Sequence, residues 1–116
     1  MATTPLMQAL QGYLKVMSER QQLVASNIAN VDTPGYQTRD VNFQAAMRQV
    51  MYEGNSVQME PASTLVEGLP ERPDGNNVNI DRESLLLGET QLQYQMAVQL
   101  IKEEFHRVLT AIKDGN

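Results

Sequence analysis

Apolar side chains recur at alternating spacings of three and four residues along the N-terminal quarter of the chain. The series consists of Met7, Leu10, Leu14, Met17, Val24, Ile28 and Val31, with Gln21 as its polar member. This spacing is typical of the a/d seam of a coiled coil, and an ordinary helix in a small bundle would also produce it. Pro5 suits a first helical turn, where its missing N–H is not needed. The pattern predicts one long amphipathic helix from about Thr4 to Asn30.

A second seam with the same spacing lies near the C-terminus and consists of Tyr94, Val98, Ile101, Phe105, Val108 and Ile112. Further apolar residues widen this seam into a broad face: Leu85, Leu92, Met96, Leu100 and Leu109. We predict a helix with Asp81 as its N-cap and an end near Lys113–Gly115. The two long helices should pair as an antiparallel coiled coil. One such pair leaves much of the broad face uncovered, so the chain is expected to be a subunit of an assembly.

The residues between the two long helices predict smaller elements. An extended run from Tyr36 to Phe43 should lead into a short helix capped by Asn42, which would end at Gly54-Asn55. Residues 56–77 are rich in proline and polar residues, so a loop is expected there, with a short hairpin of 57–59 and 64–66 as the alternative. The predicted fold is all-α and forms one domain, divided into a helix (1–31), an insert (32–77) and a second helix (78–116).

Composition argues against several classes of function. The net charge is −5 and the basic residues are scattered, whereas binding to nucleic acid needs a basic face. No apolar run is long enough to cross a membrane, and no basic start followed by an apolar run marks a secretory signal. Cysteine is absent, and His106 stands alone on the polar side of its helix, as surface histidines do. We therefore expect no enzyme activity, catalytic residue, metal or cofactor.

The first helix has to end within the stretch from Ala25 to Tyr36. Thr33 precedes a proline, which disfavours helical geometry, and Pro34-Gly35 has the residue order of a type II turn. The chain should therefore leave the helix, turn sharply and continue in an extended conformation. A Pro-Gly turn alone is common after helices, but the surrounding residues are more specific.

This stretch resembles a motif of the rod, hook and hook-associated axial proteins of the bacterial flagellum, A-x-N-[IL]-A-N-x-x-T-P-G-[YF]. After Ala25, the matching residues are Asn27, Ile28, Ala29, Asn30, Thr33, Pro34, Gly35 and Tyr36. The match has no insertion and covers about a tenth of the chain. In that family the motif ends the N-terminal helix.

Further stretches narrow the resemblance to the flagellar basal body rod proteins, and among them to the small proximal rod subunits. Residues 39–43 look like R-D-[VIL]-D-F, and residues 72–81 are similar to R-x-D-G-N-x-V-D-[IL]-D. Residues 92–95 and 109–113 also look like the C-terminal helix of those subunits. Asn42 and Asn79 stand where the family pattern has aspartate, which removes two negative charges.

The resemblance implies a structural subunit of the proximal rod without catalytic activity. Such a subunit would be exported by the flagellar type III apparatus without a cleaved signal peptide and would polymerise into the periplasmic rod wall. Its assembly seams would be those of the two terminal helices, including Leu10, Leu14, Met17, Val24 and Ile28. The implied partners are copies of itself, other rod subunits, the basal-body adaptor, the export gate and the MS ring, without nucleic acid or direct membrane insertion. The alternative is a soluble helical adaptor or export chaperone.

Overall fold

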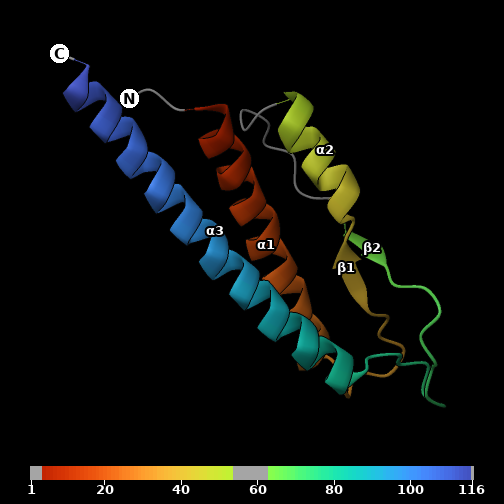
Figure 1. Ribbon diagram of the computed structural model, residues 1–116. Helices are drawn as coiled ribbons and strands as arrows, with labels where there is room; N and C mark the ends of the chain where they lie inside the picture. Colours follow the sequence, from red (N-terminus) through yellow and green to blue (C-terminus); the bar gives the residue numbers. More distant parts are fainter. Residues whose placement is uncertain (1–3, 54–62, 116) are drawn as a thin grey trace.

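The protein is a narrow rod in which two long helices run antiparallel. The computed structural model describes residues 4–53 and 63–115. Its elements in chain order are α1 (Pro5–Ala29), β1 (Arg39–Val41), α2 (Phe43–Glu53), β2 (Ser63–Leu65) and α3 (Ile80–Asp114). The molecule measures 68 × 25 × 18 Å, and the start of α1 and the end of α3 lie at the same end of it (Figure 1). The predicted all-α fold with paired terminal helices is confirmed.

Helix α1 has nearly the bounds that its apolar pattern predicts. The Thr4 hydroxyl accepts a hydrogen bond from the Met7 amide at 3.0 Å and caps the helix, and Pro5 occupies the first turn. At the other end, the Asn30 side chain donates to the Ser26 carbonyl at 2.8 Å. The same carbonyl also accepts from the Asn30 backbone amide at 3.1 Å, so Asn30 closes the last turn with both its side chain and its backbone.

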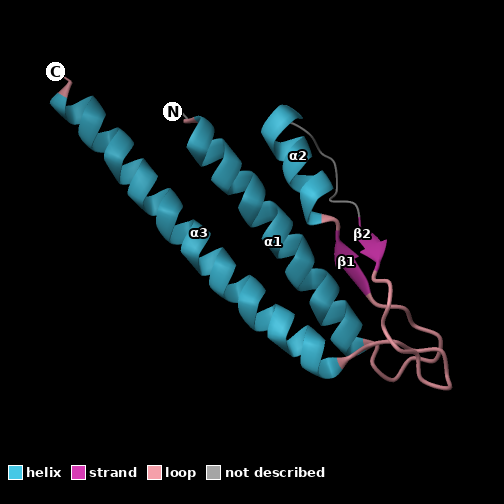
Figure 2. Cartoon of the chain, turned by 45° about the vertical axis from the view of Figure 1, so that its right-hand side comes forward, coloured by secondary structure: helices cyan, strands magenta, loops and turns pink. Residues whose placement is uncertain are grey.

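Helix α1 lies between α3 and α2, as Figures 1 and 2 both show. Its side toward α2 contributes to a small apolar core formed by Val16, Met17, Val41 and Ala46, against which Tyr13, Leu23, Met47 and Val50 pack. The rings of Tyr13 and Phe43 meet edge to face with their centroids 5.8 Å apart. As predicted, the Asn42 side chain accepts from the Ala45 amide and caps α2. The predicted stop at Gly54-Asn55 lies outside the described residues.

The two short strands form an antiparallel pair in which Arg39 faces Leu65 and Val41 faces Ser63. Part of the stretch expected to be a loop is therefore a strand. The alternative hairpin had 64–66 as one arm, and β2 overlaps that arm. Its partner strand, however, is β1, which precedes α2 in the sequence. Residues 57–59 lie outside the described part of the chain. The extended residues of β1 have free backbone hydrogen-bonding groups along their edge, and β2, which is distant in the sequence, pairs with them.

The N-cap of α3 is Asn79, so the prediction of Asp81 was wrong. The Asn79 side chain accepts from the Arg82 amide at 3.0 Å, and its backbone is extended, with φ −109° and ψ 110°. Asparagine and aspartate cap helices about equally well, so capping preference alone did not separate the two positions. Asp81 and Glu83 instead occupy the first turn, where a negative charge is favourable. The helix ends at Asp114 with Gly115 as its C-cap, as predicted.

Two glycines provide a test of this fold. A Cβ at Gly88, within α3, would meet no atom within 4 Å, whereas Gly75 has φ +85° and a Cβ there would lie 3.4 Å from the Gly35 Cα. We expect Gly88→Ala to raise the free energy of unfolding by about 1 kcal/mol, because alanine is the better helix former. Gly75→Ala should lower it by about 1 kcal/mol because of its left-handed backbone. Urea unfolding followed by circular dichroism measures both, and a destabilised Gly88→Ala chain would contradict the open environment.

Candidate assembly site

The amide of Asn27, near the end of α1, is fully buried and uses all of its hydrogen-bonding positions. Its Nδ2 donates to the Arg39 carbonyl at 2.8 Å and to Glu83 Oε1 at 2.6 Å. Its Oδ1 accepts from the Tyr36 hydroxyl at 2.9 Å and from the Arg39 amide at 3.2 Å. One side chain thus joins α1 to the turn, to β1 and to α3.

Asn76 plays a similar role from the loop that leads into α3. Its Nδ2 donates to the carbonyls of Asn30 at 2.9 Å and Thr33 at 2.8 Å, and its Oδ1 accepts from the Val78 amide at 2.8 Å. The side chain is fully buried. The loop before α3 therefore holds the backbone through which α1 ends.

Two further hydrogen bonds join the turn and this loop. The Gly35 amide donates to the Asp74 carbonyl at 2.8 Å, and the side-chain Oδ1 of Asn77 accepts from the Thr38 amide at 2.7 Å. Gly35 has φ +76°, as the second central residue of a type II turn requires. Close approach also matters, because Gly75 lies against Gly35. We call the buried residues Asn27, Asn76, Asn77 and Glu83, together with the Tyr36 hydroxyl, the polar hub.

The structure distributes the family motif between the polar hub and the surface. Asn27 is fully buried, and Tyr36, Ile28 and Asn30 are partly buried. The remaining motif residues are exposed: Ala29, Thr33, Pro34 and Gly35. The bonding roles of Asn76, Asn77 and Glu83 were not predicted from the sequence. For the two asparagines, the available signal was their place in the second family-like stretch, residues 72–81.

Charged side chains surround the buried Glu83 carboxylate. Arg82 donates to it, and the same guanidinium lies 4.0 Å from Asp40. Asp40 in turn accepts two hydrogen bonds of 3.1 Å from Arg20 on α1. This bidentate pairing joins α1 to β1 beside the polar hub. The buried negative charge is thus compensated by hydrogen bonds and by a neighbouring cation.

Helix α3 turns a line of small and polar residues toward α1. Its buried residues lie seven apart, and we call them the inner line: Glu83, Thr90, Ala97 and Glu104. Four residues of the predicted seam flank this line and are partly buried, namely Val98, Ile101, Phe105 and Val108, whereas Tyr94 and Ile112 are exposed. On α1, the seam residues Met17 and Val24 are fully buried, and Leu10, Leu14 and Ile28 are partly buried. Their role in assembly stays a prediction.

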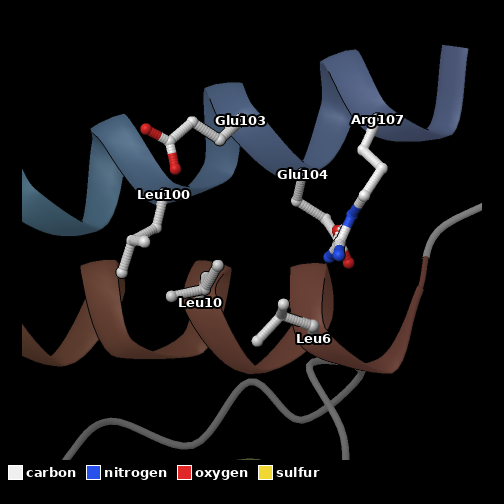
Figure 3. Close-up of a pocket in the computed structure, with 6 residues that line it drawn as sticks. All are labelled: Leu6, Leu10, Leu100, Glu103, Glu104 and Arg107. Atoms are coloured by element: carbon white, nitrogen blue, oxygen red, sulfur yellow. Dashed lines mark hydrogen bonds and ion pairs between the residues drawn. The ribbon is translucent and has the colours of Figure 1, made fainter. Parts of the chain in front are cut away.

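The inner line ends at Glu104, beside the start of α1 (Figure 3). Its carboxylate accepts from the Thr4 hydroxyl at 3.1 Å and from Arg107 Nε at 3.0 Å. The hydrogen bond from the Arg107 guanidinium lowers the pKa of the Glu104 carboxyl, and burial opposes it only in part. Because Thr4 is the N-cap of α1, this contact ties the first turn of α1 to α3. Helix α3 then continues for ten residues, to Asp114.

Six large apolar side chains of α3 stay largely exposed in the single chain. Each is between 48% and 63% exposed, and we call them the outer set: Leu85, Leu92, Met96, Leu100, Leu109 and Ile112. Beside Leu100 is a groove of about 300 Å³, lined by Leu6, Leu10, Leu100, Glu103, Glu104 and Arg107 (Figure 3). These exposed side chains are candidates for contact with a partner.

Two findings concern other kinds of site. None of the three described helices is long and apolar enough to cross a membrane. Among residues 4–53 and 63–115, His, Asp and Glu side chains form no group of three that could hold a metal ion. His106 is exposed on α3.

Comparison with known proteins identifies relatives along nearly the whole chain. Residues 7–37 match the family model described as flagella basal body rod protein. The chain is 33% identical to the flagellar basal body rod protein FlgB of Escherichia coli (strain K12), and the alignment covers 91% of each protein. It is 31% identical to FlgB of Salmonella typhimurium over 91% of each protein, and 31% identical to FlgB of Aeromonas hydrophila over 86% of each.

The polar hub predicts a large effect of removing one amide. Asn27→Ala should lower the free energy of unfolding by roughly 3 kcal/mol, because it leaves the buried Glu83 carboxylate and the Arg39 backbone without their partner. Asn42→Ala is the matched control, since it removes an exposed asparagine that caps α2, and should cost about 1 kcal/mol. Urea unfolding of both variants measures the difference. An equal loss of unfolding free energy in the two variants would contradict a role for Asn27 in joining α1 to the other segments.

Proposed function

The chain belongs to the flagellar basal body rod protein family, and we propose that it is a subunit of the proximal rod that polymerises through its two terminal helices. The family assignment makes it a structural component of the flagellum. Within the flagellum, we place the subunit in the proximal part of the rod and assign its assembly to the two terminal helices. Family membership supports this, together with the surface that the paired helices leave uncovered.

The observation that carries the mode of assembly is the exposure of the outer set on α3. Fully burying a leucine, isoleucine or methionine side chain contributes about 1.5–3 kcal/mol, and the six residues of the outer set are each about half exposed or more. Covering them would therefore contribute several kcal/mol of stabilisation. Within the described chain they have no covering element. Burial between neighbouring subunits would release this free energy and stabilise each subunit on assembly. The groove beside Leu100 offers a recess for a side chain of a neighbour.

The partners proposed for these surfaces are copies of the chain and other rod subunits. The basal-body adaptor, the export gate and the MS ring are further partners that the family resemblance supports. We propose that the subunit reaches the periplasm through the flagellar type III apparatus. A small apolar core is compatible with such passage, because export needs a chain that unfolds readily.

Assembly can be tested with a single exposed leucine. A strain lacking the gene should form MS rings without rod or hook when basal bodies are viewed by electron microscopy, and the parent gene should restore both. Leu92→Asp should fail to restore rods because it places a charge in the outer set. Its free energy of unfolding should stay within about 1 kcal/mol of the parent value, because Leu92 is 59% exposed.

Gln93→Asp is the matched control, because it places the same charge at the next position of α3, outside the outer set. It should restore rods and motility. Normal rods with Leu92→Asp would contradict assembly through the outer set. Normal flagella in the deletion strain would contradict the rod function itself and would favour a helical adaptor or export chaperone.

A further inference from the structure

The most deeply buried residues of α3 are less apolar than its exposed ones. The inner line contains two glutamates, a threonine and an alanine, whereas the outer set is made of leucine, isoleucine and methionine. The buried Thr90 hydroxyl has no hydrogen-bond partner within the described chain. Leucines in the inner line would bury more apolar area, so this arrangement does not maximise the stability of the hairpin.

Each glutamate of the inner line has a fixed partner on α1. Asn27 donates to Glu83 at one end of the helix pair, and Thr4 donates to Glu104 at the other. The two partners are 23 residues apart on α1 and the two glutamates are 21 apart on α3. At 1.5 Å per residue these separations are about 35 Å and about 32 Å, so both bonds form together in one antiparallel register.

A slip of α3 by one heptad along α1 would move it by about 10 Å and break both bonds. The apolar seam residues would still find apolar neighbours, because they recur every three or four positions. Each carboxylate would keep the arginine of its own helix, Arg82 or Arg107, but would lose its donor from α1. A buried hydrogen-bonding group that loses a partner costs about 1–3 kcal/mol. A polar residue within a coiled-coil seam selects one register in this way, at a cost in stability.

We infer that Glu83 and Glu104 determine the register of the α1–α3 hairpin and the side of α3 that faces α1. The exposed leucines Leu85 and Leu92 then stay directed away from α1. That last consequence rests on the proposed function, because it is neighbouring subunits that would use the outer set. The register itself is a property of the single chain and can be measured without assembly.

The absence of cysteine in the natural sequence allows two spin labels to be introduced at chosen sites. Suitable positions are Gln22 on α1 and Lys102 on α3, which are both exposed. They are far apart along the long axis of the hairpin, so a slip of one helix along the other strongly changes the distance between them. Pulsed electron paramagnetic resonance of the full chain should give one narrow distance distribution. In the Glu83→Leu/Glu104→Leu double variant, we expect a second population displaced by roughly 10 Å.

Matched variants separate a change of register from a general change in hydrophobicity. Glu89→Leu/Glu103→Leu makes the same substitutions at exposed glutamates of α3 and should keep the single distance. Glu83→Gln/Glu104→Gln keeps an accepting oxygen at each site and should keep it as well. A single narrow distance in the Glu83→Leu/Glu104→Leu variant would overturn the inference, as would a broad distribution in the parent chain. Neither result would affect the rod assignment.

Discussion

The structure depends on one buried amide. Asn27 lies where α1 must end, and its side chain bonds at once to the turn, to β1 and to α3. A buried polar group without partners costs about 1–3 kcal/mol, so losing any one of these segments would destabilise the others through Asn27. The family motif therefore does more than end α1. Through Asn27 it links the turn, β1 and α3 to the end of α1.

The rest of the rod divides into regions held by different forces. At one end the polar hub and the Arg20–Asp40 pair join four segments by hydrogen bonds and charge. In the middle a small apolar core joins α1 to α2 and β1. At the other end the contact between Thr4 and Glu104 holds the start of α1. Much of the apolar surface of α3 takes part in none of these, which gives the hairpin a surface suited to neighbours.

Local patterns in the sequence were sufficient to predict much of this fold. The three–four apolar spacing placed both long helices, and Pro34-Gly35 placed the turn, because each signal acts between residues close in the chain. Asn42 was correctly assigned as a cap for the same reason. Asn79 and Asp81 are both good caps only two residues apart, and the choice between them depended on where the preceding loop was anchored.

The inner line could not be predicted in this way. Burial was expected of apolar residues, but the glutamates Glu83 and Glu104 are buried, and each is stabilised by a donor on α1. These donors are 56 and 100 residues away in the chain, so no local pattern could indicate them. The pairing of β2 with β1 also joins distant segments across α2. For both features, the stabilising contact exists only after the two long helices have come together.

A double-mutant cycle between Asn27 and Glu83 tests the central role of the buried amide most directly. Free energies of unfolding of the parent chain, Asn27→Ala, Glu83→Ala and the double variant would give the coupling between the two side chains. We expect a coupling of about 2 kcal/mol, with the double variant losing less than the sum of the two single losses, because the residues share one buried hydrogen bond. Additive losses, within about 0.5 kcal/mol, would contradict a junction at Asn27.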